Sequence, residues 1–127
     1  MEKQPIFGAG TAVSGAPYTP AVRVGDMLFI SGQLGLDPQT KQPHTEFAAQ
    51  VEGAIAGIRS LVEAAGGSLS SVVKTTIFLS GDMSRFAELN GIYAAHFSEG
   101  VKPARSTFAV AALPLGALVE IEAIAVL

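Results

Sequence analysis

Short runs of apolar and β-branched residues, separated by turn residues, predict β-strands in the first third of the chain. The segments Ala21–Val24 and Met27–Ser31 flank Gly25–Asp26, a pair that tolerates the positive φ of a tight turn. Together they predict a β-hairpin. A further short strand is expected near Pro5–Phe7. The polar segment Asp37–Pro43 contains two prolines and predicts a loop.

The spacing of apolar residues then changes to steps of three and four, which predicts an α-helix. Thr45 is the expected N-cap, and Glu46 lies favourably at the positive end of the helix dipole. Gly66–Gly67 is expected to end the helix, because glycine readily adopts left-handed backbone angles. The apolar stripe consists of Phe47, Val51, Ala54, Ile55, Ile58, Leu61, Val62 and Ala65.

The second half of the chain predicts another helix between β-strands. Ser71–Leu79 is rich in β-branched residues and predicts a strand. Asp82 is the expected N-cap of the helix, and Gly100 is expected to close it. Two last strands are expected near Arg105–Ala112 and Leu118–Val126, with a loop between them. The apolar face of the helix consists of Phe86, Leu89, Tyr93 and Phe97.

This order of elements predicts an α+β fold in a single domain spanning residues 1–127. We expect one mixed sheet of about six strands with two helices on one face. The last strands are apolar on both faces, since Phe108 and Val110 alternate with Ala109 and Ala111. Two helices on one side leave the other side of the sheet uncovered. A partner chain is therefore expected to bury it.

The composition supports the same expectation. Charged residues make up only 15% of the chain, against a typical share of about 25%. The mean hydropathy is +0.42. A monomer with this composition would expose large apolar patches, and such patches usually mark an interface. The composition therefore indicates a homo-oligomer.

Charge, hydropathy and cysteine content disfavour several classes of protein. The net charge is −3, the pI is about 5.2, and Lys and Arg are scattered, which argues against binding to nucleic acid. No apolar stretch approaches the roughly 20 residues that span a bilayer, and the N-terminal residues lack the apolar core of a signal peptide. A cytoplasmic protein is therefore expected. Cysteine is absent, and His44 and His96 are too few for a histidine-built metal site unless carboxylates supply most of the ligands.

Three charged residues in the last two strands are candidate reactive groups. Burying an unpaired guanidinium costs several kcal/mol, so Arg105 needs a partner, and its planar fork suits a carboxylate. That partner is either Glu120 or Glu122 in a structural ion pair, or a bound ligand. Glu120 and Glu122 are two residues apart and point to one strand face, which is either solvated or part of a proton-handling set with Arg105. The register of the two strands stays open.

Other polar residues carry weaker signals. Gly32 at the end of the hairpin strand allows close approach of a ligand, and the amides around Ser31 suit a carboxylate, although a plain strand end is the simpler interpretation. Tyr18 lies between prolines and by itself is an ordinary loop aromatic. Asn90 is by itself a satisfied polar group of a helix. No phosphate-binding glycine loop or nucleophile-elbow motif occurs.

Several short segments, spread over nearly the whole chain, carry a family resemblance when taken together. The C-terminal group is Lys102–Thr107, Leu113–Pro114 and Val119–Val126. The other segments are Ala16–Tyr18, Ile30–Gln33, Val62–Gly66, Val73–Phe78 and Asn90–Tyr93. In order and spacing they resemble the Rid family of reactive intermediate deaminases, also called YjgF-like proteins, from about Gly15 to the C-terminus.

The resemblance implies a chorismate-mutase-like fold that assembles as a homotrimer with a cleft between each pair of subunits. It also implies hydrolysis of 2-iminobutanoate and 2-iminopropanoate without a metal or an organic cofactor. By resemblance, Arg105 binds the substrate carboxylate and Glu120 holds and activates the attacking water. The backbone carbonyl of Thr107 shares this water, and the cleft is lined by Tyr18, Ser31, Gly32 and Asn90.

Three departures from the family pattern bear on the substrate. Thr107 stands where many members carry cysteine, so thiol chemistry is absent while a backbone role remains. Ala16 replaces the glycine that usually precedes Pro17, and Pro20 follows Thr19, next to the Tyr18 loop. These departures leave open a preference for larger imines or enamines, or a loss of deaminase activity. Two other functions also stay open: a protein that binds a small carboxylate metabolite without turnover, and a ribonuclease or translation inhibitor, as some relatives have been described.

Overall fold

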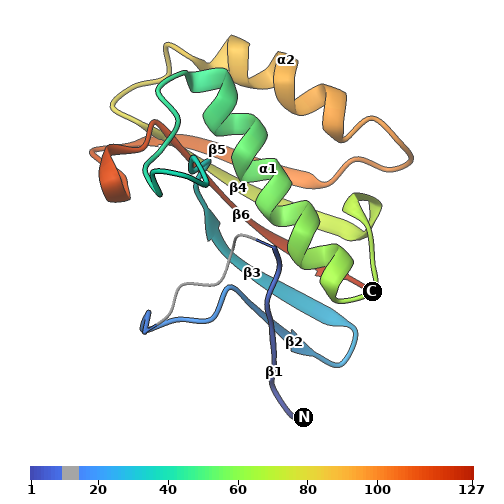
Figure 1. The fold of residues 1–127 in the computed structure, drawn as a ribbon. Helices are drawn as coiled ribbons and strands as arrows, with labels where there is room; N and C mark the ends of the chain where they lie inside the picture. Colours follow the sequence, from blue (N-terminus) through green and yellow to red (C-terminus); the bar gives the residue numbers. More distant parts are fainter. Residues whose placement is uncertain (10–14) are drawn as a thin grey trace.

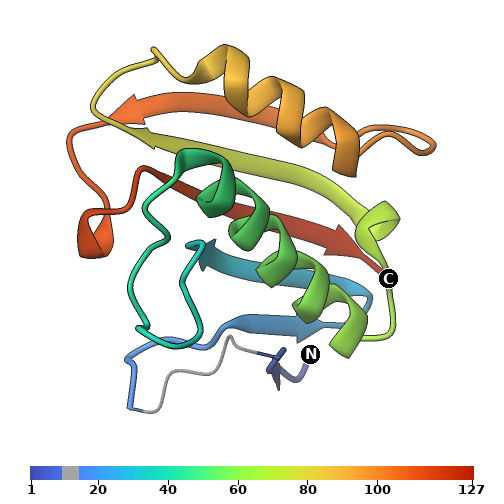
Figure 2. The same ribbon diagram turned by 45° about the horizontal axis from the view of Figure 1, so that its top comes forward.

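A computed structural model of the protein describes residues 1–9 and 15–127. One six-stranded sheet carries two α-helices on one face (Figure 1, Figure 2). The α+β fold predicted from the sequence is therefore confirmed. The strands are β1 (Gln4–Ile6), β2 (Ala21–Val24), β3 (Met27–Gln33), β4 (Val72–Ser80), β5 (Ala104–Val110) and β6 (Val119–Val126). The helices are α1 (Phe47–Ala64) and α2 (Phe86–His96), with short 3₁₀ helices η1 (Leu69–Ser71) and η2 (Pro114–Gly116).

The strand order in the sheet is β1-β2-β3-β6-β4-β5. The pair β4 and β5 is parallel, and every other neighbouring pair is antiparallel. The expected hairpin of β2 and β3 is present, with Gly25 at φ 60° in its turn. The last two strands of the chain do not pair with each other, because β4 lies between them. This topology separates Arg105 on β5 from Glu120 on β6.

The apolar stripe predicted for α1 is buried along its whole length. It packs against the sheet over β6 and β3, while α2 lies over β4 and β5 (Figure 2). The strands contribute fully buried side chains to the same core, among them Leu28, Ile77 and Ile121. Removal of this apolar surface from water is the main stabilising contribution to the fold.

The predicted N-caps are wrong for both helices. Glu46, rather than Thr45, is the N-cap of α1, and it makes no side-chain capping hydrogen bond. Asp82 lies too far upstream to cap α2, whose N-cap is Arg85. The Oδ1 atom of Asp82 instead accepts the backbone N–H of Ser84 at 2.9 Å. An aspartate bonded to the backbone two residues further on forms a local turn, and this turn competes with the cap.

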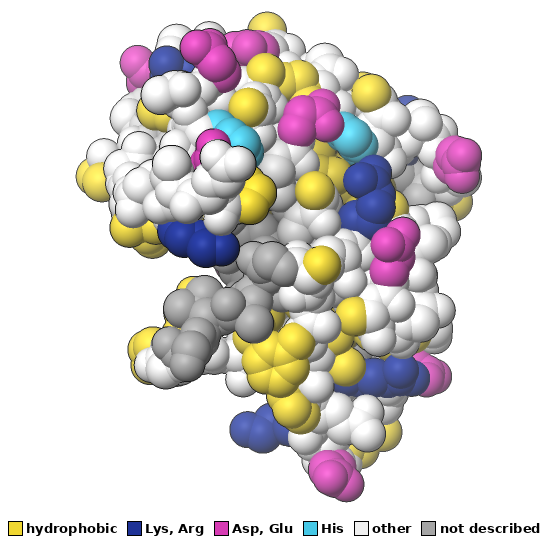
Figure 3. Space-filling view, viewed as in Figure 1, with side chains coloured by type: hydrophobic (Ala, Val, Ile, Leu, Met, Phe, Trp, Pro, Cys, Tyr) yellow, Lys and Arg dark blue, Asp and Glu magenta, His cyan; other side chains and the backbone are white. Residues whose placement is uncertain are grey.

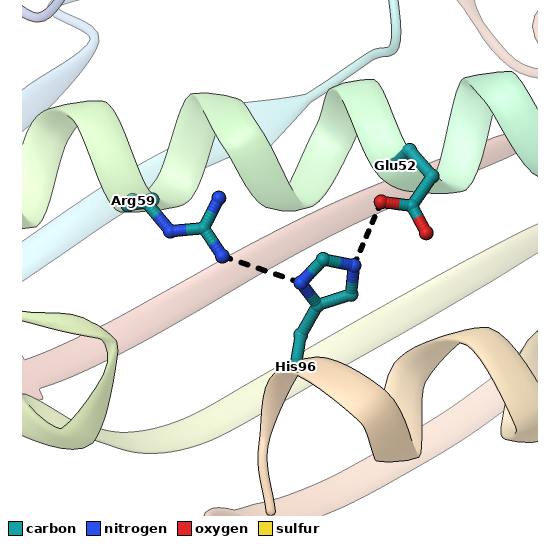
Figure 4. Close-up of polar contacts among 3 residues, drawn as sticks. All are labelled: Glu52, Arg59 and His96. Carbon is teal, nitrogen blue, oxygen red and sulfur yellow. Dashed lines mark hydrogen bonds and ion pairs between the residues drawn. The ribbon is translucent and has the colours of Figure 1, made fainter.

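His96 is the last residue of α2, so this helix ends four residues before Gly100, where closure was expected. The imidazole of His96 links the two helices (Figure 4). Its Nε2 atom lies 2.7 Å from Oε2 of Glu52, and its Nδ1 atom lies 3.2 Å from Nη2 of Arg59, both on α1. A guanidinium can only donate, so Nδ1 accepts and Nε2 carries the proton. The link holds α2 against α1 above the sheet.

The loop that follows β3 approaches α1 closely enough to require glycine. A Cβ atom on Gly35 would collide with the backbone of Gln50, and one on Gly53 would lie 2.7 Å from the Cα of Gly35. The side chain of Gln50 then ties this region together. Its Nε2 donates to the carbonyl of His44 at 2.6 Å, and its Oε1 accepts the N–H of Leu118 at 2.8 Å.

Gly35→Ala is expected to lower the free energy of unfolding by roughly 2–3 kcal/mol, because the backbone of α1 cannot move aside for the new methyl group. Urea denaturation measures the change. Gly91→Ala is the matched control, since nothing lies within 4 Å of a Cβ at this position in α2. Helix propensity there favours alanine by about 0.5–1 kcal/mol. Equal stability of the two variants would contradict the close approach of the loop.

The sheet face opposite the helices exposes apolar side chains. Met27 and Phe29 on β3, Phe108 on β5 and Val126 on β6 are each between 41% and 46% exposed. We call these four residues the open face. Phe108 also meets Phe78 of β4 edge to face, with ring centroids 5.1 Å apart. Among the described residues, no helix is long and apolar enough to cross a bilayer.

Candidate functional site

Glu120 lies on the open side of the sheet, directly over a glycine. It pairs in register with Phe78 of β4 and so points away from the helices. On its other side, the register of β3 shifts between Ile30 and Gln33, and this irregularity places Gly32 beside the carboxylate. A Cβ atom on Gly32 would collide with the Glu120 carboxylate. Glycine is therefore required at this position, and the bulge positions the acid.

Four residues proposed from the sequence line one cavity of about 840 Å³: Tyr18, Ser31, Gly32 and Glu120. Ser31 holds the Tyr18 loop in place. Its hydroxyl donates to the Thr19 carbonyl at 2.6 Å, and its backbone N–H donates to the Pro20 carbonyl at 2.9 Å. Because both donors of Ser31 are used within the chain, this residue shapes the cavity rather than offering a free amide.

The environment of Glu120 favours its neutral form. Burial raises the pKa of the Glu120 carboxyl above its ordinary value, and the negative charge of Glu122 on the same strand face raises it further. A carboxylate whose pKa is shifted toward neutrality is better suited to accept and return a proton.

Arg105 lies on the other side of the sheet, under α2. It pairs in register with Thr75, which is fully buried on the helix side. Its guanidinium carbon lies 5.0 Å from the ring centre of Tyr93 and 5.6 Å from that of Phe86. The two aromatic faces stabilise the cation without using its N–H donors. The fork of Arg105 therefore remains suited to an anionic ligand.

Two buried oxygens near Arg105 have no hydrogen-bond partner among the described residues, namely Oδ1 of Asn90 and Oγ1 of Thr107. Thr107 follows Arg105 on the same strand face. Asn90 lies on the stripe of α2 that carries Phe86 and Tyr93, at helical steps of four and three. An unpaired buried polar atom is costly in a folded protein, and its presence is typical of a site that a ligand or water completes. Asn90, Arg105 and Thr107 thus form a second group.

The two groups are on opposite faces of the sheet within one protomer. Thr75 faces the helices and pairs with Arg105 on one side and Ala123 on the other. Glu120 is three residues from Ala123, so its side chain points to the opposite face. A structural ion pair of Arg105 with Glu120 or Glu122, one of the two alternatives left by the sequence, is therefore wrong. Glu120 and Glu122 do share a face, as predicted.

Sequence reasoning missed the positioning roles of Tyr93, Phe86 and Gln50. Tyr93 was assigned only to the core. Its hydroxyl lies 2.7 Å from Oγ1 of Thr75, burial raises the pKa of its phenol, and its ring supports Arg105. The polar Asn90 within the same helical stripe was the sequence signal that could have indicated this role. Gln50 holds one wall of the cavity in place through its bond to the His44 carbonyl. The available sequence signal for this role was a polar residue within the apolar stripe of α1.

The charged groups do not gather into a metal site or a basic surface. Within the described part of the chain, no three His, Asp or Glu side chains come together in a way that could hold a metal ion. On the face shown in Figure 3, the Lys and Arg side chains are interspersed with Asp and Glu.

Comparison with known proteins identifies the family. The family model described as "Endoribonuclease L-PSP" matches residues 10–127. The chain belongs to this family, the Rid family. It is 41% identical over 112 residues to the Escherichia coli protein named 2-iminobutanoate/2-iminopropanoate deaminase, covering 87% of both chains. It is also 42% identical over 121 residues to Protein HMF1 of Saccharomyces cerevisiae, covering 95% of this chain and 92% of the relative.

A solved Rid structure has the same fold. The crystal structure of RidA from an Antarctic Psychrobacter species superposes with a TM-score of 0.89 at 44% identity, covering 98% of this chain and 99% of the other. The family prediction made from the short sequence segments is therefore confirmed. Relatives of this Rid protein carry names of different kinds, a deaminase among them, so the reaction itself is argued below.

Proposed function

We propose that this Rid protein is an imine deaminase that hydrolyses 2-iminobutanoate and 2-iminopropanoate to 2-oxo acids and ammonia. The observation that carries the proposal is the Glu120 carboxylate. It is held against Gly32 inside a cavity, with a raised pKa, in a chain 41% identical to a named deaminase. Such a group can take a proton from water without any covalent step on the protein.

The proposed chemistry needs positioning and one proton acceptor. Arg105 binds the carboxylate of the imino acid through paired N–H donors. Water, held by Glu120 and by the backbone carbonyl of Thr107, adds its oxygen to the imine carbon and gives a proton to Glu120. The imine nitrogen takes up a proton, the resulting carbinolamine releases ammonia, and the carbonyl of the 2-oxo acid forms. The imine carbon is already electrophilic, so orientation supplies much of the rate.

A complete site on this scheme requires two chains. Arg105, Thr107 and Asn90 lie under α2. The Glu120 side chain points to the opposite face of the sheet, and Glu120 lines a cavity together with Gly32, Ser31 and Tyr18. We infer that one chain supplies the first group and its neighbour the second, in a homotrimer with a site at each interface. The exposed apolar side chains of the open face support this assembly, because a neighbouring chain would bury them.

The assembly is testable by sedimentation. The wild-type protein is expected to sediment at three times the chain mass of 13.0 kDa. Phe108→Asp, which places a charge on the open face, is expected to yield smaller species and to lose activity with them. Val101→Asp is the matched control, because Val101 is 95% exposed and lies in the loop between α2 and β5, outside the open face. Dissociation of both variants, or of neither, would contradict burial of the open face.

The reaction is tested with freshly generated 2-iminobutanoate. A threonine dehydratase supplies the unstable substrate, and release of ammonia is followed with and without this protein. Acceleration by the wild-type protein is expected. A folded protein that binds 2-oxobutanoate but gives no acceleration would establish a binding protein instead.

A further inference from the structure

A threonine interrupts the apolar, helix-facing side of β4. Its neighbours on this side, Ile77 and Leu79, are apolar and buried, and Thr75 is fully buried among them. Placing a hydroxyl among apolar side chains is unfavourable unless the hydroxyl is hydrogen-bonded. Valine has nearly the same shape as threonine and would occupy this position without that requirement. Core packing alone therefore does not require threonine here.

The hydrogen-bond partner of Thr75 is a tyrosine of α2. Oγ1 of Thr75 lies 2.7 Å from the hydroxyl oxygen of Tyr93, and both groups are buried. Burial raises the pKa of the Tyr93 phenol, so the phenol keeps its proton at working pH. Among the described residues, this is the only hydrogen bond between a side chain of α2 and the sheet, because His96 bonds to α1. Thr75 thus ties α2 to the sheet beneath it (Figure 2).

The ring of Tyr93 in turn supports Arg105. Its centre lies 5.0 Å from the guanidinium carbon, and its other ring contact is with Phe97, at 4.5 Å between centroids. A cation over an aromatic face is held by the charge distribution of the ring, so the position of the cation follows the ring. Phe86 also lies beside Arg105, at 5.6 Å, but it has no polar group through which the sheet could fix it. The contacts therefore run from Thr75 through Tyr93 to the proposed carboxylate-binding fork.

Stability alone does not account for the pair of Thr75 and Tyr93. Replacing two hydrogen-bonded groups with apolar groups of the same shape is often neutral or even stabilising. A hydrogen bond is directional, however, and so it gives the ring an orientation that apolar packing would not specify. Orientation matters at Arg105, because a planar fork binds a carboxylate through two parallel N–H bonds.

We propose that Thr75 is a positioning residue for the substrate carboxylate: by fixing the Tyr93 ring, it sets the orientation of the Arg105 fork without touching the substrate. This proposal rests on the proposed imine hydrolysis, in which Arg105 binds the carboxylate, and adds a residue to that site. A side chain that holds a binding group in its productive geometry contributes to affinity from outside the site. Loss of the Thr75 hydroxyl is expected to weaken carboxylate binding about tenfold, as for one well-placed cation–ring contact.

Calorimetry with the stable product 2-oxobutanoate measures carboxylate binding without turnover. Thr75→Val is expected to raise the dissociation constant about tenfold, whereas Thr75→Ser keeps the hydroxyl and should stay within about twofold of wild type. Tyr93→Phe keeps the ring but loses the bond, so it should match Thr75→Val. The two losses should not add in the double variant, because both substitutions remove the same bond.

Kinetics and stability separate positioning from a general loss of structure. In Thr75→Val, KM for 2-iminobutanoate is expected to rise about tenfold. The acid limb of the pH profile should not move, because Glu120 points to the opposite face of the sheet. Ile55→Val is the matched control, since it removes one methyl group from the fully buried side of α1. It is expected to lower the thermal midpoint to a similar degree and to leave the dissociation constant unchanged.

Each outcome bears on a different statement. An unchanged dissociation constant in Thr75→Val, a tenfold loss in Thr75→Ser, or additive losses in the double variant would overturn the positioning role. An equal loss of affinity in Ile55→Val would also overturn it, because affinity would then follow stability in general. A wild-type protein that binds 2-oxobutanoate but does not hydrolyse the imine would remove the proposed reaction, and the binding data would still decide the role of Thr75. A wild-type protein that binds no 2-oxobutanoate would remove both.

Discussion

Arg105→Ala is expected to lower kcat/KM for 2-iminobutanoate by about a thousandfold, a loss of roughly 4 kcal/mol of transition-state stabilisation. The substrate carboxylate would lose its paired donors, and the imine carbon would no longer be held near the water. Because Arg105 rests on the rings of Tyr93 and Phe86, its removal should cost the fold only about 0.5–1 kcal/mol for each lost contact. The measurements are ammonia release and thermal unfolding of the same preparation.

A second arginine provides the matched control. Arg59 on α1 also contacts a ring, the imidazole of His96, but lies at the helix–helix contact away from the cavity. Arg59→Ala is expected to keep kcat/KM within about twofold of wild type while removing a comparable surface contact. Arg105→Lys keeps the charge without the planar fork and should fall between the wild type and Arg105→Ala. Full activity of Arg105→Ala would exclude the proposed carboxylate site.

Glu120→Gln is expected to lower kcat/KM by about a hundredfold or more, since glutamine cannot take a proton from water. The wild-type activity should fall as the pH drops through the pKa of Glu120, which burial and Glu122 hold above its ordinary value. Only the ionised form, which predominates above that pKa, can act as a base. Glu122→Gln removes the neighbouring negative charge, which is the second cause of the raised pKa. This variant is therefore expected to keep its activity to a lower pH than the wild type. Ammonia release measured between pH 4 and pH 8 tests both statements.

The same carboxyl should reduce stability at neutral pH. A carboxyl whose pKa is raised in the folded protein binds its proton more tightly when folded, so the fold loses stability as the pH rises through that pKa. Glu120→Gln resembles the protonated form and is expected to be more stable than wild type at neutral pH. The difference in stability between Glu120→Gln and the wild type should vanish when the pH is below the ordinary carboxyl pKa. An active site often retains such a destabilising charge because the reaction needs it. A Glu120→Gln variant that stays active would show that another group accepts the proton.

Sequence periodicity determined the elements that depend on local chemistry. The stripe from Phe47 to Ala65, the turn at Gly25–Asp26 and the β-branched strand near Val72 were predictable because burial on one face imposes a repeat of three to four or of two. The start of α2 was not predictable in the same way, because the Asp82 side chain accepts the backbone N–H of Ser84 in a local turn instead of capping the helix. The short recurrent segments also sufficed to identify the family.

The relation between Arg105 and Glu120 was decided by the tertiary structure. Their separation along the chain suggested neighbouring strands, but β4 inserts between β5 and β6 through long-range pairing that no local pattern encodes. The register of these pairings sets the two side chains on opposite faces. The bulge near Gly32 is likewise a product of how distant segments meet. The sequence determined which chemical groups the chain carries, whereas strand pairing decided which of them share a cavity, because register and face depend on contacts between residues far apart in the chain.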